Sequence, residues 1–97
     1  MKYKNLLKKL SKTSEHHRYR HAAVVAKGNS IYGCAVNTEG HHAEINALWA
    51  AGAHSKGATL YTLMTRKTDG SIGNGSPCDM CMEAITQAKI RKVVVYV

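Results

Sequence analysis

The chain has 97 residues, of which 44% are hydrophobic, and this length and composition suit one globular domain with a single core. No apolar run is long enough to span a bilayer, and the first ten residues lack the features of a signal peptide. The three cysteines are an odd number, which excludes a complete disulfide framework. We therefore expect a single cytoplasmic domain over residues 1–97, with no membrane partner.

The formal net charge is +8, and its distribution along the chain is uneven. Residues 1–27 hold eight basic side chains against Glu15 alone, which leaves the rest of the chain close to neutral. A basic segment of this kind favours partners that carry phosphate, either a nucleotide or a nucleic acid. A solvated face of an amphipathic helix explains the same charges equally well. The basic residues of the segment are Lys2, Lys4, Lys8, Lys9, Lys12, Arg18, Arg20 and Lys27.

The N-terminal part of the chain predicts a helix followed by a β-hairpin. Leucines at helical spacing in residues 2–12 indicate a short amphipathic helix. Residues 16–21 are typical of a polar connection. Two apolar runs, residues 22–27 and 30–36, flank a Gly28-Asn29 pair, and this pattern is typical of two antiparallel strands joined by a tight turn.

The middle of the chain alternates between helix and strand signals. Residues 41–51 are rich in helix formers and are followed by Gly52, a typical C-terminal cap. Residues 58–65 predict a strand, and the glycines in residues 66–76 predict a loop.

A third helix is predicted over residues 77–89. Ser76 suits the N-cap, Pro77 suits the first helical position, and Asp79 completes a capping box. The β-branched run at residues 93–97 then predicts a buried strand. Strands that alternate with helices in this way indicate an α/β fold with helices packed on a sheet.

Three side chains on two of these helices form a potential metal site. Cys78 and Cys81 are three residues apart at a helix start, a spacing that places both sulfurs on one face. We expect the helix N-terminus to lower the pKa of the thiols. Together with His42 they provide three protein ligands, the number found in catalytic zinc sites that keep a fourth position for water. Zinc-bound water ionises near neutral pH.

Glu44 distinguishes a catalytic zinc site from a structural one. It lies two residues after His42, so it can sit beside the metal and transfer a proton. An H-x-E triplet alone arises by chance, and a lone C-x-x-C is also typical of a redox pair. Their combination at two helix starts favours zinc, and a purely structural zinc site would leave Glu44 without a task.

Other histidines, cysteines and aromatic residues carry weaker signals. Cys34 is expected to be a small buried side chain within a strand. Trp49 and Tyr61 are expected in the core. His41 competes with His42 for a metal but lacks the H-x-E spacing, and His21 is a packing residue or lines a pocket.

The pattern His42-Ala43-Glu44 with Pro77-Cys78-Asp79-Met80-Cys81 resembles the zinc signature of the cytidine deaminase-like superfamily. The segment from residue 21 to Asn37 is similar to the first two strands of that family. The resemblance implies a three-layer α/β/α fold with a mixed sheet of order 2-1-3-4 and the zinc-bearing helices on one face. It also implies that His42, Cys78 and Cys81 bind Zn²⁺ and that Glu44 carries the proton.

The same resemblance implies deamination of a cytosine-containing nucleoside or nucleotide, with release of ammonia. Two alternatives stay open: a deaminase of cytosine or adenine in single-stranded DNA or RNA, and a non-catalytic, zinc-stabilised module that binds nucleic acid. The sequence ends after the fourth expected strand, so a second copy in a homo-oligomer could supply a missing pocket wall. The expected substrate contacts are Asn37, Ala43, Arg66, Ser76 and Pro77.

Overall fold

The computed structural model describes residues 2–15, 19–38 and 41–97. Within these ranges no helix combines the length and the apolar character needed to cross a membrane. Residues 16–18 of the predicted polar connection lie outside the described ranges. The rest of that segment is not a connection, because residues 19–21 form the start of the first strand and pair with its neighbour.

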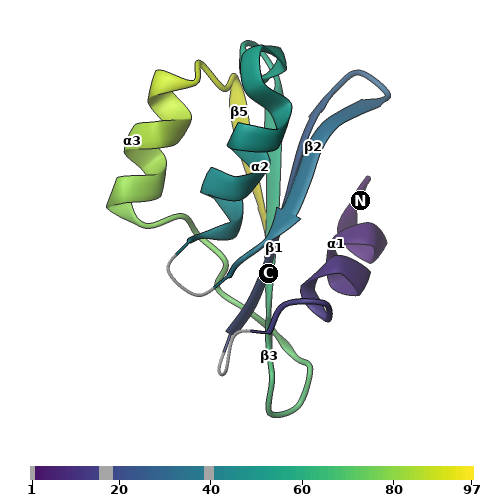
Figure 1. Cartoon of the computed structure of the whole chain (residues 1–97). Coiled ribbons are helices and arrows are strands. Elements are labelled where there is room, and N and C mark those ends of the chain that lie inside the picture. Colours follow the sequence, from purple (N-terminus) through teal and green to yellow (C-terminus); the bar gives the residue numbers. More distant parts are fainter. Residues whose placement is uncertain (1, 16–18, 39–40) are drawn as a thin grey trace.

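A mixed sheet forms the middle layer of the fold (Figure 1). Strand β1 (Tyr19–Lys27) pairs antiparallel with both β2 (Ser30–Val36) and β3 (Thr59–Arg66). Strand β5 (Lys92–Tyr96) pairs in parallel with the other edge of β3. The four main strands therefore have the order β2-β1-β3-β5, which confirms the predicted order 2-1-3-4.

Helices cover both faces of this sheet, which confirms the three-layer prediction. Helix α1 (Lys4–Ser11) packs on one face, and α2 (Ala43–Ala51) and α3 (Asp79–Gln87) pack on the other (Figure 1). Alternate residues of β1 point to opposite faces, so the strand contributes to two cores. The α1 core includes Tyr3, Leu7, Ala22, Val24 and Leu63. The core under α2 and α3 includes Ala23, Val25, Ala47, Leu60 and Ile85.

The predicted loop at residues 66–76 contains a short strand that the sequence did not reveal. Strand β4 (Ile72–Gly73) pairs antiparallel with the end of β3. The side chain of Arg66 holds the turn, since its guanidinium donates to Ser71 Oγ and to the Ile72 carbonyl at 3.1 and 3.2 Å. Two residues are too few to leave an alternating pattern, so the loop prediction was wrong at this point.

Helix α2 lies close against the sheet because β2 has a glycine beneath it. A Cβ at Gly33 would lie 2.5 Å from the Ala47 carbonyl oxygen, so no other residue permits this approach. The helix begins directly after His42 and ends at Gly52, which has a positive φ of 55° and confirms the predicted C-terminal cap. A short 3₁₀ turn, η1 (Gly52–Ser55), follows.

Helix α3 begins two residues later than predicted. Cys78 occupies the N-cap position, and no side chain in the described part of the chain caps this end. The predicted capping box is wrong because Ser76 is engaged elsewhere: its backbone N–H and its hydroxyl both donate to Asn74 Oδ1, at 3.0 and 2.7 Å. The local turn at Asn74 therefore takes the serine that would have capped the helix.

The burial predictions were wrong for the last strand and for two side chains. Residues 93–95 are only half-buried, because within the described ranges β5 pairs with β3 alone. Cys34 is exposed because it pairs with Val24 on the α1 side of the sheet, where α1 packs mainly against β1 and β3 and leaves β2 open. Trp49 is 67% exposed on the outer side of α2. Tyr61, in contrast, packs against the α1 core and confirms its prediction.

Candidate metal centre and active-site cavity

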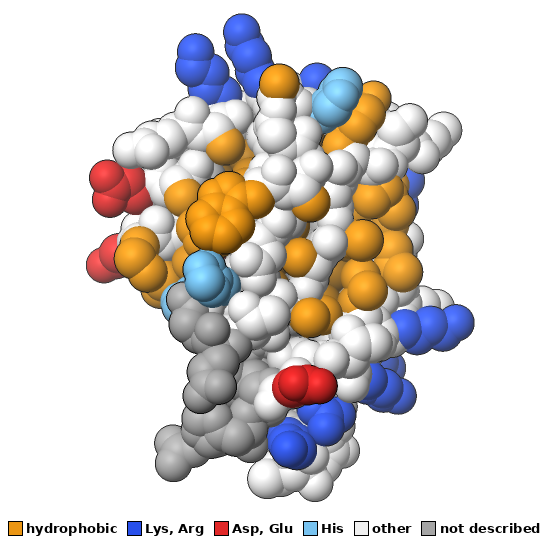
Figure 2. Space-filling model, in the orientation of Figure 1, with side chains coloured by type: hydrophobic (Ala, Val, Ile, Leu, Met, Phe, Trp, Pro, Cys, Tyr) orange, Lys and Arg blue, Asp and Glu red, His pale blue; other side chains and the backbone are white. Residues whose placement is uncertain are grey.

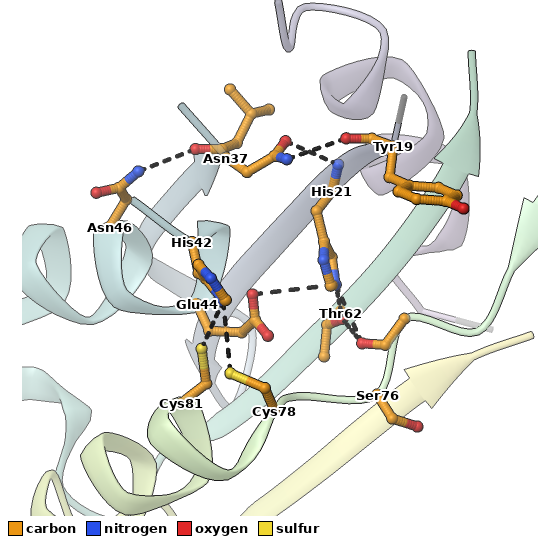
Figure 3. Close-up of polar contacts among 12 residues, drawn as sticks. Tyr19, His21, Asn37, His42, Glu44, Asn46, Thr62, Ser76, Cys78 and Cys81 are labelled. Carbon is orange, nitrogen blue, oxygen red and sulfur yellow. Dashed lines mark hydrogen bonds and ion pairs between the residues drawn. The ribbon is translucent and has the colours of Figure 1, made fainter. Parts of the chain in front are cut away.

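Three potential metal ligands converge where α2 and α3 begin (Figure 3). The Nδ1 atom of His42 lies 3.6 Å from Cys78 Sγ and 3.1 Å from Cys81 Sγ, and all three ligand atoms lie within 4.8 Å of one another. Tetrahedral zinc, with bonds of about 2.3 Å to sulfur and about 2.0 Å to nitrogen, separates such atoms by about 3.6 Å. Both thiols are free rather than joined in a disulfide. The donor set and its spacing therefore fit zinc.

The fold brings these ligands together from segments 36 residues apart. His42 occupies the N-cap position of α2, Cys78 occupies that of α3, and Cys81 lies in the first turn of α3. The two helices contact each other on the same face of the sheet. His41 is not part of the cluster, since its ring lies edge-on to Trp49 at a centroid distance of 5.5 Å.

The pKa of the Cys81 thiol is raised, whereas the sequence predicted a lowered one. Burial, contact with Cys78 and the nearby Glu44 carboxylate raise the pKa of the Cys81 thiol to about 12. The prediction that the helix N-terminus lowers the thiol pKa is therefore wrong for Cys81, because desolvation outweighs the favourable helix dipole. Such a buried thiol becomes a thiolate when a cation replaces its proton.

Glu44 lies beside this cluster with one oxygen unused. Its side chain is 1% exposed, and within the described ranges its Oε1 atom has no hydrogen-bond partner. A buried carboxylate oxygen without a partner is costly, so it indicates a site for a bound group. In Figure 3 the Glu44 carboxylate lies between His42 and His21, close to the two cysteines.

A cavity of about 440 Å³ opens next to Glu44, within the size range of small-ligand sites. Two of the predicted substrate contacts, Arg66 and Ser76, line it. Ala43 is fully buried, and neither it nor the half-buried Pro77 is among the lining residues. The lining residues are Tyr19, His21, His42, Glu44, Met64, Arg66, Asn74, Ser76 and Cys78.

Asn37 has a structural role at the end of β2. Its Oδ1 accepts hydrogen bonds from the His21 backbone N–H at 2.9 Å and from Ser14 Oγ at 2.6 Å. Its Nδ2 donates to the Tyr19 carbonyl at 3.0 Å. The side chain thus ties β2 to the beginning of β1, outside the cavity lining, and its contact with substrate stays a prediction.

One polar residue of the cavity, His21, was not predicted as a site residue. His21 Nε2 lies 2.9 Å from Thr62 Oγ1, 3.0 Å from the Gly75 carbonyl oxygen and 4.0 Å from Glu44 Oε1 (Figure 3). The signal that could have found it is the period of two in β1. That period places His21 on the same face as Ala23, toward α2 and α3, once the strand is extended to residue 19.

Comparison with known proteins agrees with this geometry. The riboflavin biosynthesis protein RibD of a Synechocystis strain is 40% identical over 81 residues, which cover 75% of this chain but only 19% of that protein. The chain thus spans about a fifth of the length of this curated relative.

Solved structures that share this fold include a RibD protein and a dCMP deaminase. RibD of Acinetobacter baumannii superposes with a TM-score of 0.65 and 27% identity, over 93% of this chain and 25% of that one. The apo form of a dCMP deaminase from the cyanophage S-TIM5 superposes with a TM-score of 0.74 and 27% identity, over 96% of this chain and 78% of that one.

The family model described as the cytidine and deoxycytidylate deaminase zinc-binding region matches residues 1–97. Together with the cluster of one imidazole and two thiols, this match identifies Zn²⁺ as the cofactor. The chain belongs to the cytidine and deoxycytidylate deaminase family, whose zinc-binding region it matches.

Proposed function

We propose that the chain hydrolyses the exocyclic amine of cytosine in a free nucleoside or nucleotide of the cytidine or dCMP type. The oxygen of water bonds to the ring carbon that carries the amine, the C–N bond breaks, and ammonia leaves with the uracil form as the product. The observation that carries this proposal is the unpartnered Glu44 oxygen beside the three converging zinc ligands, two of which, His42 and Cys78, line the same cavity as Glu44.

Different residues of the chain bind the metal and transfer the protons. His42, Cys78 and Cys81 hold the zinc, which when bound supplies Lewis-acid activation of water at neutral pH. Glu44 accepts one proton of the attacking water through its free Oε1 and passes it to the ring nitrogen. It then accepts the second proton of the same oxygen and passes it to the leaving amine. Because Glu44 is 1% exposed, bulk water does not compete strongly for this carboxylate.

The substrate is held by the remaining walls of the cavity. Arg66 offers a positive charge and Ser76 a hydroxyl at the lining, where both suit a sugar or phosphate group. Backbone N–H groups at the start of α3 steady negative charge on the reacting base. Asn37, Ala43 and Pro77 are not among the lining residues, and their contact with substrate stays a prediction.

A substrate panel tests the proposal. The zinc-loaded chain is incubated with cytosine, cytidine, dCMP, dCTP, adenosine, guanine and an aminopyrimidine nucleotide whose base is not cytosine, and ammonia or mass change is measured. We expect turnover of cytidine or dCMP. The aminopyrimidine nucleotide is included because two of the similar proteins are riboflavin biosynthesis proteins. Turnover of that compound alone would replace cytosine as the substrate base.

A second candidate function is deamination of a base within single-stranded DNA or RNA. The observation that favours it is the position of the basic helix. Ser11, at the end of α1, bonds to Thr65 at an oxygen–oxygen distance of 3.0 Å, and Thr65 precedes the cavity residue Arg66. The end of α1 therefore packs on β3 next to Arg66, but on the opposite face of the sheet from α2 and α3. A polymer would have to pass around this end of the sheet to place its phosphates on the α1 lysines and a base in the cavity.

Salt dependence separates these two functions. For an oligonucleotide bound by several lysines, we expect the apparent affinity to fall steeply between low and moderate salt, because counterion release is lost. For a neutral nucleoside we expect almost no change. The measurement is KM for cytidine and for a cytosine-containing oligonucleotide over a salt series. Turnover of the nucleoside but not of the oligonucleotide would remove the second candidate.

We also infer that the chain self-associates. Figure 2 shows hydrophobic side chains gathered over α2 and α3, and the large exposed ones there include Trp49, Met80 and Met82 at 67%, 64% and 41%. Within the described ranges β5 pairs only with β3, so its outer edge is open as well. Exposed apolar side chains of this kind mark protein interfaces.

The Trp49→Glu variant tests this interface. A carboxylate at the centre of an apolar contact would be desolvated without a partner, so we expect the variant to be monomeric where the wild type is larger. Sedimentation velocity at several protein concentrations measures the difference. The control is Leu6→Glu, at a side chain that is 36% exposed on α1, on the other face of the sheet. A monomeric wild type would refute the inference.

A further inference from the structure

The ring of His21 stands between the zinc-bearing loop and Glu44. Its Nε2 atom is within hydrogen-bond distance of Thr62 Oγ1 and the Gly75 carbonyl oxygen, and 4.0 Å from Glu44 Oε1. His21 lines the cavity and is 19% exposed. Neither the zinc ligands nor the proton transfer proposed above uses this side chain.

The hydrogen-bond partners of His21 Nε2 determine whether this nitrogen carries a hydrogen. The Gly75 carbonyl oxygen can only accept hydrogen bonds, and it already accepts one from the Thr62 hydroxyl at 2.9 Å. Contact at 3.0 Å between this oxygen and His21 Nε2 therefore requires a hydrogen on Nε2. That hydrogen is directed to Gly75 and Thr62, and so it is not donated to Glu44.

The segment around Gly75 is pressed against the sheet. A Cβ at Gly75 would lie 3.1 Å from the Met64 backbone nitrogen and 3.3 Å from both His21 Nε2 and Thr62 Oγ1. Glycine is therefore the residue that allows its carbonyl to reach both donors. Because Gly75 precedes the ligand Cys78 by three residues, fixing this carbonyl restricts the position of the sulfur.

We propose that His21 is a positioning residue that acts through Gly75 and Glu44, and this proposal rests on the function proposed above. Its Nε2–H holds the Gly75 carbonyl, which keeps the loop and Cys78 in place for zinc. Because the same hydrogen is committed to Gly75 and Thr62, the Oε1 atom of Glu44 keeps its lone pairs free for the reacting proton. Thr62 supports the arrangement by donating to the same carbonyl.

The test compares His21→Leu, which removes the donor at similar size, with His21→Gln, whose amide N–H reaches about the same point. Two quantities are measured on the full chain: the apparent zinc affinity by chelator competition, and kcat and KM for the best substrate. For His21→Leu we expect zinc affinity and kcat to fall by about 10- to 100-fold, as when a partner of a zinc ligand is lost, with little change in KM. His21→Gln should restore both quantities close to wild type.

Two outcomes overturn the proposal: unchanged zinc affinity and kcat in His21→Leu, or equal loss in His21→Gln. If His21→Leu fails to fold, two variants of Thr62, the other donor to the Gly75 carbonyl, replace it. Thr62→Val removes the hydroxyl and should weaken zinc binding, whereas Thr62→Ser keeps the hydroxyl and should not. His54→Leu is the control, since His54 is exposed and stacks on Tyr32 away from the cavity lining. An inactive wild type refutes the proposed function, while the zinc measurement still tests His21.

Discussion

Replacement of Glu44 by glutamine is expected to lower the rate of ammonia release by about 10²- to 10⁴-fold, the usual contribution of a positioned proton-transfer group. The amide has nearly the same shape as the carboxylate, but it cannot accept and return a proton. Zinc content should not change, because Glu44 lies beside the ligands rather than among them. Ammonia release, bound zinc and melting temperature are measured on the same preparation.

The stability of this variant gives an independent result. The wild-type protein buries an oxygen of Glu44 without a partner in the described ranges, so a neutral side chain at this position should keep or raise the melting temperature. Activity that survives in Glu44→Gln would contradict the proposed proton transfer. A wild type that retains zinc, deaminates nothing in the panel and binds oligonucleotides would favour the non-catalytic nucleic-acid-binding module.

Replacement of Cys81 by alanine is expected to abolish zinc binding and activity together. Loss of a residue that only hydrogen-bonds to a zinc ligand weakens zinc binding by up to roughly 100-fold. Loss of one of the three protein ligands themselves should weaken it by more than that. Cys81 is fully buried at the first turn of α3, so loss of the metal should also lower the melting temperature. Zinc content by elemental analysis and thermal unfolding by circular dichroism measure both effects.

The chain supplies its own control for this experiment. Cys34 is the third cysteine and is exposed on β2, so Cys34→Ala should retain both zinc and activity. Chelation of wild-type zinc should reproduce the Cys81→Ala phenotype, and added zinc should reverse it only in the wild type. Equal zinc contents in Cys81→Ala and the wild type would disprove the ligand assignment.

The sequence was sufficient to predict most elements of the fold and the zinc cluster. The apolar runs in β1 and β5 and the glycine after α2 are strong local signals, and the two short motifs fix the ligands. Such signals are readable because each depends on residues that are neighbours in the chain. The same is true of Glu44, whose place beside the three potential ligands follows from its spacing from His42.

Features that depend on distant neighbours were harder to predict. Serine is a common N-cap residue, but the hydrogen bonds of Ser76 go to Asn74. Residue propensities do not distinguish a serine in a helix cap from a serine in such a turn. Trp49 and Cys34 are apolar, yet their exposure depends on what covers α2 and β2. The role of His21 depends on the Gly75 carbonyl, which is 54 residues away.

The β3–β4 hairpin has a consequence for how the protein can change over evolution. It supplies Arg66 and Asn74 to the cavity, whereas the metal ligands come from the starts of α2 and α3. The turn of the hairpin, at residues 67–71, is exposed and touches neither core. Insertions there can reshape the mouth of the cavity without displacing the metal, so selectivity can diversify while the chemistry is inherited unchanged.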